Sequence, residues 1–228
     1  MPYPFAHPAA VLPLVPVLGR FAVPSALAIG SIAPDLWHLV PFVSRADSHS
    51  PAALLWFCLP AGLLAYLLFH LVLKQPLIAL AWPRLGAFAC KGFPPSPWHA
   101  VAASLLLGAL THLAWDALTH TNDHTVQDPN WFQHANTLLG SVILGAWIWR
   151  RVRRVPRVPY RLSVFHRGCA ALAIAGAMAI SALCSADTWP AFDRQLLKSV
   201  GIGALQGLVA ALLVYALIFQ RKILRRGA

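Results

Sequence analysis

The chain lacks glutamate altogether and has few charged side chains of either sign. Only 11% of its 228 residues are charged, whereas 58% are hydrophobic, and its mean hydropathy is +0.63. Soluble globular domains carry about 25% charged residues. The shortage of charge excludes an ordinary soluble domain and predicts an all-α polytopic membrane protein, because helices are the usual way to bury a backbone in lipid.

Cysteine pairs and two common catalytic motifs are also missing. The four cysteines form no C-x-x-C pair, so the sequence implies no disulfide framework. Neither a G-x-S-x-G elbow nor a G-x-x-x-x-G-K phosphate loop occurs. Sequence motifs therefore do not support a function as a serine hydrolase or a nucleoside triphosphatase.

Long apolar runs dominate what remains. Each has a charge-free core of about 18 residues or more, which is enough for a transmembrane helix; they cover residues 51–73, 98–115, 131–149, 168–186 and 199–220. Residues 1–50 are apolar but interrupted by prolines and a Gly19-Arg20 break. The prediction is five long transmembrane helices plus an N-terminal broken helical hairpin, up to seven helices in all.

Basic residues gather after alternate apolar runs and predict an orientation. The clusters are Lys74, Arg84 and Lys91; Arg150, Arg151, Arg153, Arg154, Arg157 and Arg161; and Arg221, Lys222, Arg225 and Arg226. With five alternating spans, all three clusters lie on one face, which the positive-inside rule makes cytoplasmic together with the C-terminus. The opposite face then receives all seven aspartates.

The net charge of +11 could indicate nucleic acid, but basic residues between apolar spans more often set orientation and contact anionic lipid. We therefore expect membrane lipids and no nucleic acid as partners, with anionic lipid contact through Arg150, Arg151, Arg153 and Arg154. Prolines 156 and 159 place a boundary in this loop. It separates residues 1–150, which carry the polar site, from a two-helix part at 151–228.

The most polar stretch in an apolar setting runs from Thr111 to His124. A step of four residues places His112, Asp116 and His120 on one helical face. Imidazole with carboxylate suits zinc, iron or manganese, and carboxylate oxygen also suits magnesium. A carboxylate near the bilayer is costly unless paired or ligated. The alternative is a structural hydrogen-bond network without metal.

Spacing limits how this face could bind an ion. His112 and His120 are eight residues apart, or about 12 Å along a helix, whereas metal–ligand bonds are about 2 Å long. Both histidines cannot bind one ion on an unbroken helix. We favour a single ion held by His112 and Asp116 with help from the N-terminal segment, and the alternative is Asp116 bridging two ions.

Four motifs together resemble a known family: His7-Pro8-Ala9-Ala10-Val11-Leu12-Pro13, Gly30-Ser31-Ile32-Ala33-Pro34-Asp35, Ser48-His49-Ser50, and the segment from Gly108 to His120. They resemble bacterial integral membrane proteins of domain-of-unknown-function family 4184. More distantly, their order is similar to that of inner-membrane metal-dependent hydrolases, themselves likened to zinc-dependent phospholipase C. The resemblance implies a bacterial cytoplasmic membrane location and a ligand set of His7, Asp35, His49, His112 and Asp116.

The chain departs from those hydrolases at two places. Trp37 stands where they have a second aspartate, and Ala46-Asp47-Ser48 replaces a basic-glycine lead into the His-Ser motif. These departures count against a centre of two metals.

The predicted function is metal-dependent hydrolysis of a lipid-like or phosphoester substrate at the outer face of the membrane. The expected cofactor is a divalent ion, zinc first, with manganese, iron and magnesium as alternatives. Asp47 or His120 would serve as the base. The competing hypotheses are a transporter or proton-handling protein, a non-catalytic scaffold, and a b-type haem protein. His70, at the predicted cytoplasmic end of its helix, is the only candidate for a second transport cluster.

Overall fold

The computed structural model describes residues 4–92, 96–119, 130–156, 163–186 and 194–226, and within these ranges the secondary structure is entirely helical. The prediction of an all-α protein is confirmed. Contacts divide the chain into two units, Met1–Leu67 with Cys90–Pro156 and Leu68–Ala89 with Arg157–Ala228. The first unit holds every described residue of the predicted ligand set. The domain boundary expected at 150/151 stays a prediction.

The N-terminal region is built from short helical segments: η1 (Pro4–Ala9), α1 (Leu14–Leu18), η2 (Gly19–Phe21), α2 (Pro24–Gly30), η3 (Ala33–Leu39) and α3 (Arg45–Ser48). Proline lies at the start of α2 and η3, where its missing N–H costs nothing. Gly19 ends α1 with φ of 53°, a conformation that glycine adopts without strain. None of these segments is long enough to span a bilayer, and a membrane-embedded hairpin stays a prediction.

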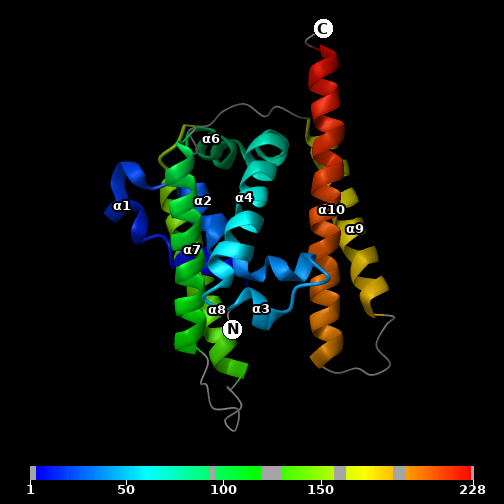
Figure 1. The fold of residues 1–228 in the computed structure, drawn as a ribbon. Coiled ribbons are helices and arrows are strands. Elements are labelled where there is room, and N and C mark those ends of the chain that lie inside the picture. The colour runs from blue at the N-terminus through cyan, green and yellow to red at the C-terminus, as the bar shows by residue number, and fades with distance from the viewer. Residues whose placement is uncertain (1–3, 93–95, 120–129, 157–162, 187–193, 227–228) are drawn as a thin grey trace. The chain divides into compact units, whose positions relative to one another are not determined.

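The elements that follow are η4 (Leu54–Cys58), α4 (Leu59–Leu67), η5 (Leu68–Leu73), α5 (Lys74–Leu80), α6 (Pro83–Gly92), α7 (Trp98–Thr119), α8 (Asn130–Val152), α9 (Val164–Ala186) and α10 (Arg194–Arg226). Elements η4 to α5 join into one helix with two π-helical segments. Figure 1 shows α2, α4 and α7 side by side in the first unit.

Among the described residues, four helices are long and apolar enough to cross a membrane: Leu54–Leu80, Trp98–Thr119, Phe165–Ala186 and Ser199–Phe219. The prediction of five is therefore not reproduced, because the run at 131–149 is not among them. Its helix α8 has 23 residues, so length is not the reason. The first turns contain Gln133, His134, Asn136 and Thr137, and these polar residues lower its hydropathy.

Two glycines bring α2 and α7 into backbone contact. A Cβ atom on Gly30 would collide with the carbonyl oxygen of Leu105, and one on Gly108 would collide with the carbonyl oxygen of Leu27 and lie 2.7 Å from the Ser31 backbone nitrogen. Close helix approach through small residues is a common way of packing helices in membranes. The contact places the α7 turn after Gly108 against the C-terminal end of α2.

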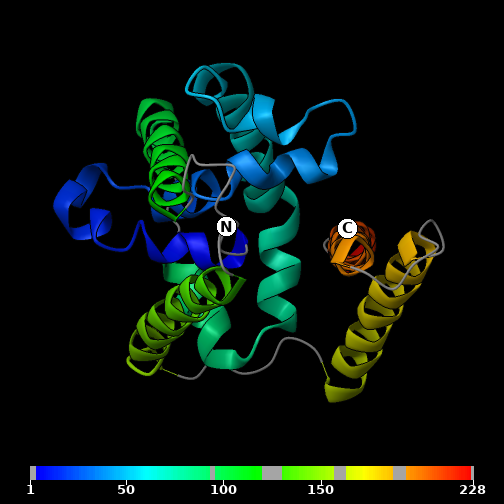
Figure 2. The ribbon, with the colours of Figure 1, turned by 90° about the horizontal axis from the view of Figure 1, so that it is seen from below.

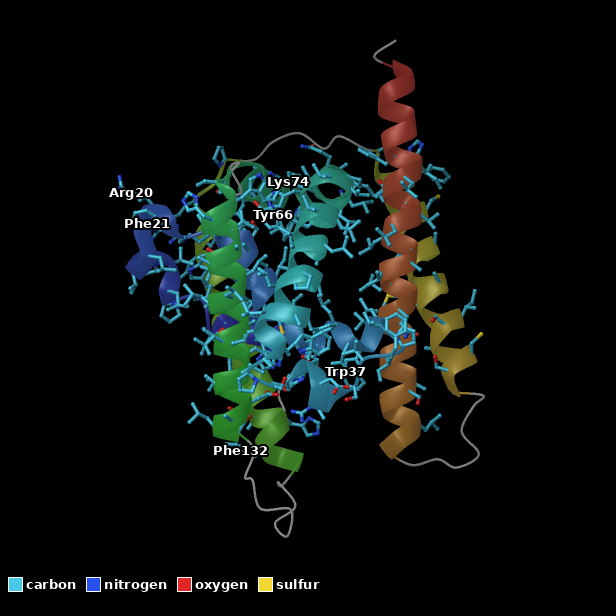
Figure 3. All side chains as sticks on the ribbon, in the orientation of Figure 1. Arg20, Phe21, Trp37, Tyr66, Lys74 and Phe132 are labelled. Atoms are coloured by element: carbon cyan, nitrogen blue, oxygen red, sulfur yellow. The ribbon has the colours of Figure 1, made fainter. Side chains whose placement is uncertain are left out.

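Two apolar clusters surround this contact. One contains Val23, Ala26, Tyr66, Ala100, Val101 and Leu105. The other contains Ala33, Ala53, Phe57, Cys58 and Ala109, with Trp37 packed against it. Figure 3 shows Tyr66 and Trp37 at different levels of the first unit, so the clusters follow one another along the helices.

Element η1 is held against α8 and α7. A Cβ on Gly140 of α8 would lie 3.0 Å from the Ala6 side chain and 3.1 Å from the Trp115 ring. Figure 2, seen from below, shows the N-terminal segment between these two helices. Ala6 and His7 are completely buried as a result.

In the second unit, α9 and α10 pack through small residues. Gly203 faces Ser181 and Ser185, and Gly207 faces the Ala177 carbonyl. The Arg167 Nε group donates to the Leu80 carbonyl oxygen at 3.1 Å, which ties α9 to the end of α5.

The α2–α7 contact yields a test of packing. We expect Gly108→Ala to destabilise the protein by about 1–3 kcal/mol, the usual cost of overpacking, and to lower its melting temperature in detergent. Gly145→Ala in α8 is the matched control, because no atom lies within 4 Å of a Cβ there and alanine favours a helix. Equal melting temperatures for both variants would contradict the proposed contact.

Candidate metal centre

Four side chains from three segments of the first unit turn their ligand atoms toward one another. The His49 Nε2 and His112 Nε2 atoms are 3.3 Å apart. Asp35 Oδ1 lies 3.5 Å from His49 Nε2 and 3.8 Å from His112 Nε2. Asp116 Oδ2 lies 3.6 Å and 3.7 Å from the same two nitrogens. All four side chains are at most 9% exposed.

His7 of η1 is the fifth member of the cluster. Its ring stacks on His112 with centroids 3.8 Å apart and planes at 21°, and its Nε2 atom lies 3.9 Å from Asp116 Oδ1. The structure thus brings together all five residues that the resemblance implied as ligands. Two triads have ligand atoms within 4.8 Å of one another: His7, Asp35 and His112, and His49, His112 and Asp116.

The glycine contact between α2 and α7 determines how His112 is oriented. His112 lies one turn after Gly108, and its Nδ1 atom is 2.8 Å from the carbonyl oxygen of Ser31. A carbonyl can only accept a hydrogen bond, so Nδ1 carries the proton. In the neutral ring, the Nε2 atom of His112 therefore carries a lone pair, which points toward the cluster.

Ser48 orients His49 in the same way. Its hydroxyl donates to the Arg45 carbonyl at 3.2 Å and lies 2.9 Å from His49 Nδ1. A hydroxyl has a single proton, so both contacts are satisfied when His49 Nδ1 donates to Ser48. The Cys58 thiol, 3.6 Å from the Ser48 carbonyl, further anchors this turn to η4.

With these tautomers the two Nε2 lone pairs face each other, and neither nitrogen can donate a hydrogen bond to the other. A cation between them resolves this arrangement, because two nitrogens bound tetrahedrally at 2.0–2.1 Å lie about 3.3 Å apart. The observed nitrogen–nitrogen distance is 3.3 Å. A histidine whose other ring nitrogen is held by an oxygen acceptor is also typical of metal ligands.

Burial and the neighbouring histidines act in opposite directions on the pKa of the Asp35 carboxyl group. Burial raises the pKa of its carboxyl group, but the contact with the His49 ring and the positive charge that His112, His7 and His49 carry when protonated lower it more, so the net shift is downward. A bound cation would act in the same direction, because a carboxylate must be ionised to bind a metal.

Of the two residues predicted as bases, the structure describes only Asp47, which lies outside the cluster. Asp47 is exposed, and its carboxylate accepts hydrogen bonds from the Ser44 backbone N–H and hydroxyl in a capping box at α3. These bonds lower the pKa of Asp47. His120 lies outside the described residues, together with Asp123, His124 and Asp128. The roles of Asp47 and His120 stay predictions.

Sequence reasoning missed Arg45 and the two groups that orient the histidines. The Arg45 Nη2 atom lies 3.1 Å from Asp116 Oδ2. Arg45 precedes His49 by four residues, one helical turn, and this spacing was the available signal. The Ser31 carbonyl and the Ser48 hydroxyl could not be recognised without the fold.

Comparison with known proteins identifies the family of this chain but no activity. The model of Domain of unknown function (DUF4184) matches residues 1–217. The chain belongs to the DUF4184 family. No curated protein and no solved structure matches it. The chemistry of this DUF4184 protein must therefore be argued from the cluster itself.

The hydroxyl beside His49 gives a test of how the centre is built. We expect Ser48→Ala to weaken zinc binding by about 10- to 100-fold, the usual loss when a group that orients a ligating histidine is removed. Competition with a chromogenic chelator measures this affinity. Ser50→Ala is the control, because its hydroxyl contacts only the Asp47 carbonyl and the Ala53 N–H. Equal affinities in both variants would contradict the assigned role.

Proposed function

We propose that this DUF4184 protein is a metal-dependent hydrolase of the bacterial cytoplasmic membrane that acts on a lipid-like or phosphoester substrate. The observation that carries the proposal is the pair of imidazole nitrogens 3.3 Å apart, bordered by two carboxylates. The distant similarity of the motif order to inner-membrane metal-dependent hydrolases points the same way.

The donor set fits a divalent cation. Two imidazole nitrogens and two carboxylate oxygens contain no thiolate and suit zinc first, with manganese and iron as alternatives, and magnesium if the carboxylates dominate. His49, His112, Asp35 and Asp116 would hold a single ion. The two oxygens of Asp116 face different histidines, with His7 on the Oδ1 side, so the alternative of a bridged pair stays a prediction.

A bound divalent ion supplies acidity to water and polarises a phosphoryl or carbonyl oxygen. The protein's own residues orient the ligands, supply charge and limit access of water. The Ser31 carbonyl and the Ser48 hydroxyl keep both imidazoles aimed into the site. Asp35 and Asp116 supply negative charge, and the burial of all four side chains keeps bulk water from competing. Asp47 and His120 are the candidates for moving the proton.

The membrane orientation belongs to the same proposal. Five spans require α8 to cross the membrane, and its 23 residues give a length of about 35 Å, enough to do so. This crossing places the arginines that follow α8 on the cytoplasmic side and the metal centre near the outer face. Phospholipids of the outer leaflet are then the nearest substrates.

The transporter, scaffold and haem hypotheses stay predictions, and no contact in the part of the chain that the structure describes favours them. Transport would need a second polar cluster further across the membrane. Both candidate metal triads among the described residues belong to the one cluster.

The test combines metal analysis with turnover. Protein purified without a histidine tag should contain stoichiometric metal and hydrolyse a fluorescent phosphodiester or phospholipid vesicles, because the metal is required for both site and reaction. Asp116→Asn and His112→Ala should lose the metal and fall to the protein-free rate. Mass spectrometry of bound metals and a fluorescence assay provide the two measurements.

His99→Ala is the matched control on the same helix. His99 is exposed and lies thirteen residues before His112, or about 20 Å away, so this variant should keep metal and activity. Wild-type protein without stoichiometric metal, together with unchanged melting and lipid turnover in Asp116→Asn, would refute the proposal.

A further inference from the structure

Arg45 is the charged residue at the solvent edge of the metal centre. Its Nη2 atom contacts Asp116 Oδ2 at 3.1 Å, while its side chain is 42% exposed, against 7% for Asp116. The same Oδ2 atom is the one that faces His49 and His112. The guanidinium group therefore borders both the place of the cation and the solvent from which a substrate would arrive.

The local fold holds Arg45 in this position. Arg45 is the first residue of α3, whose capping box joins Ser44 and Asp47. The Arg45 carbonyl accepts from the His49 backbone N–H at 3.0 Å and from the Ser48 hydroxyl at 3.2 Å. The turn that aims His49 into the site thus also fixes the backbone of Arg45, and Asp47 is occupied by the cap rather than by Arg45.

The charges around the site explain why an arginine is useful there. With neutral imidazoles, the two carboxylates and one guanidinium among the described residues of the site give a net charge of one negative. A divalent cation changes this to one positive. If Arg45 served only to neutralise Asp116, it would be redundant once the cation was present and would repel it. A centre that is positive when loaded is suited to an anion.

We propose that Arg45 is an anion-binding residue that recognises a phosphoryl oxyanion of the substrate next to the metal. This inference rests on the proposed metal centre and deepens it by naming a substrate class. Arginine suits the role because its planar group forms charge-assisted, often paired, hydrogen bonds to phosphate oxygens. The oxyanion is that of a lipid headgroup or of a soluble phosphate, and the two arms of the test separate these sources.

The test measures binding, independently of turnover. Purified full-length protein loaded with zinc is titrated with inorganic phosphate and, separately, with a short-chain phosphatidylglycerol in micelles, using calorimetry. We expect Arg45→Gln to weaken binding of at least one probe by about 10- to 100-fold, the range for a lost hydrogen bond to a charged group. Arg45→Lys, which keeps the charge but loses the planar fork, should lie in between.

Zinc affinity separates recognition from structural support. Removing the guanidinium frees Asp116 and removes a positive charge, so Arg45→Gln should bind zinc as well as or better than wild type while it binds the anion less well. Arg20→Gln is the matched control, because Arg20 is exposed and lies over the Phe21 ring; both affinities should stay at the wild-type value.

Each result decides the matter. Dependence in the lipid arm alone assigns a headgroup, dependence in the phosphate arm alone assigns a soluble phosphate, and dependence in both arms assigns any phosphoryl oxyanion; each of the three supports the inference. Equal binding of both probes to Arg45→Gln and wild type, or a parallel loss of zinc and anion, would overturn it while leaving the metal centre intact. Wild-type protein that binds no zinc would refute the metal centre and this inference together.

Discussion

The backbone contact between α2 and α7 is the constraint on which the rest of the centre depends. Gly30 and Gly108 let the two helices approach until the Ser31 carbonyl lies against the ring of His112. This single hydrogen bond fixes the tautomer and direction of His112. Asp116 follows one turn later on the same face of α7, and His7 stacks on the His112 ring. A larger side chain at either glycine would separate the helices and displace His112 from its partners.

The second determinant is electrostatic. When the Nδ1 atom of each ring carries the proton, the two Nε2 atoms face each other as lone pairs beside two buried carboxylates, an arrangement that is unfavourable when nothing positive lies between them. The Ser31 carbonyl and the Ser48 hydroxyl impose this arrangement, because they hydrogen-bond to the Nδ1 atoms of His112 and His49. Arg45 supplies one positive charge from the edge through its ion pair with Asp116. A divalent cation satisfies all four ligand atoms at once, and the same logic makes the loaded site attractive to an anion.

Sequence alone predicted the helical class and the membership of the cluster, but for different reasons. The four-residue spacing of His112 and Asp116 is a local property of a helix and could be derived directly. His7, Asp35 and His49 come from segments far apart in the chain, so only the resemblance, not spacing, implied them. The roles of Ser31, Ser48 and Arg45 depend on contacts between segments. The span count among the described residues is lower than five because the polar residues in the first turns of α8 offset the apolar length of residues 131–149.

The central claim is that the cluster binds a cation through histidine nitrogen and carboxylate oxygen. X-ray absorption spectroscopy at the metal edge of the purified protein tests it most directly. We expect a first shell of nitrogen and oxygen only, at about 2.0–2.2 Å, with scattering from at least two imidazole rings. A sulfur shell near 2.3 Å, or a shell without imidazole scattering, would contradict the account.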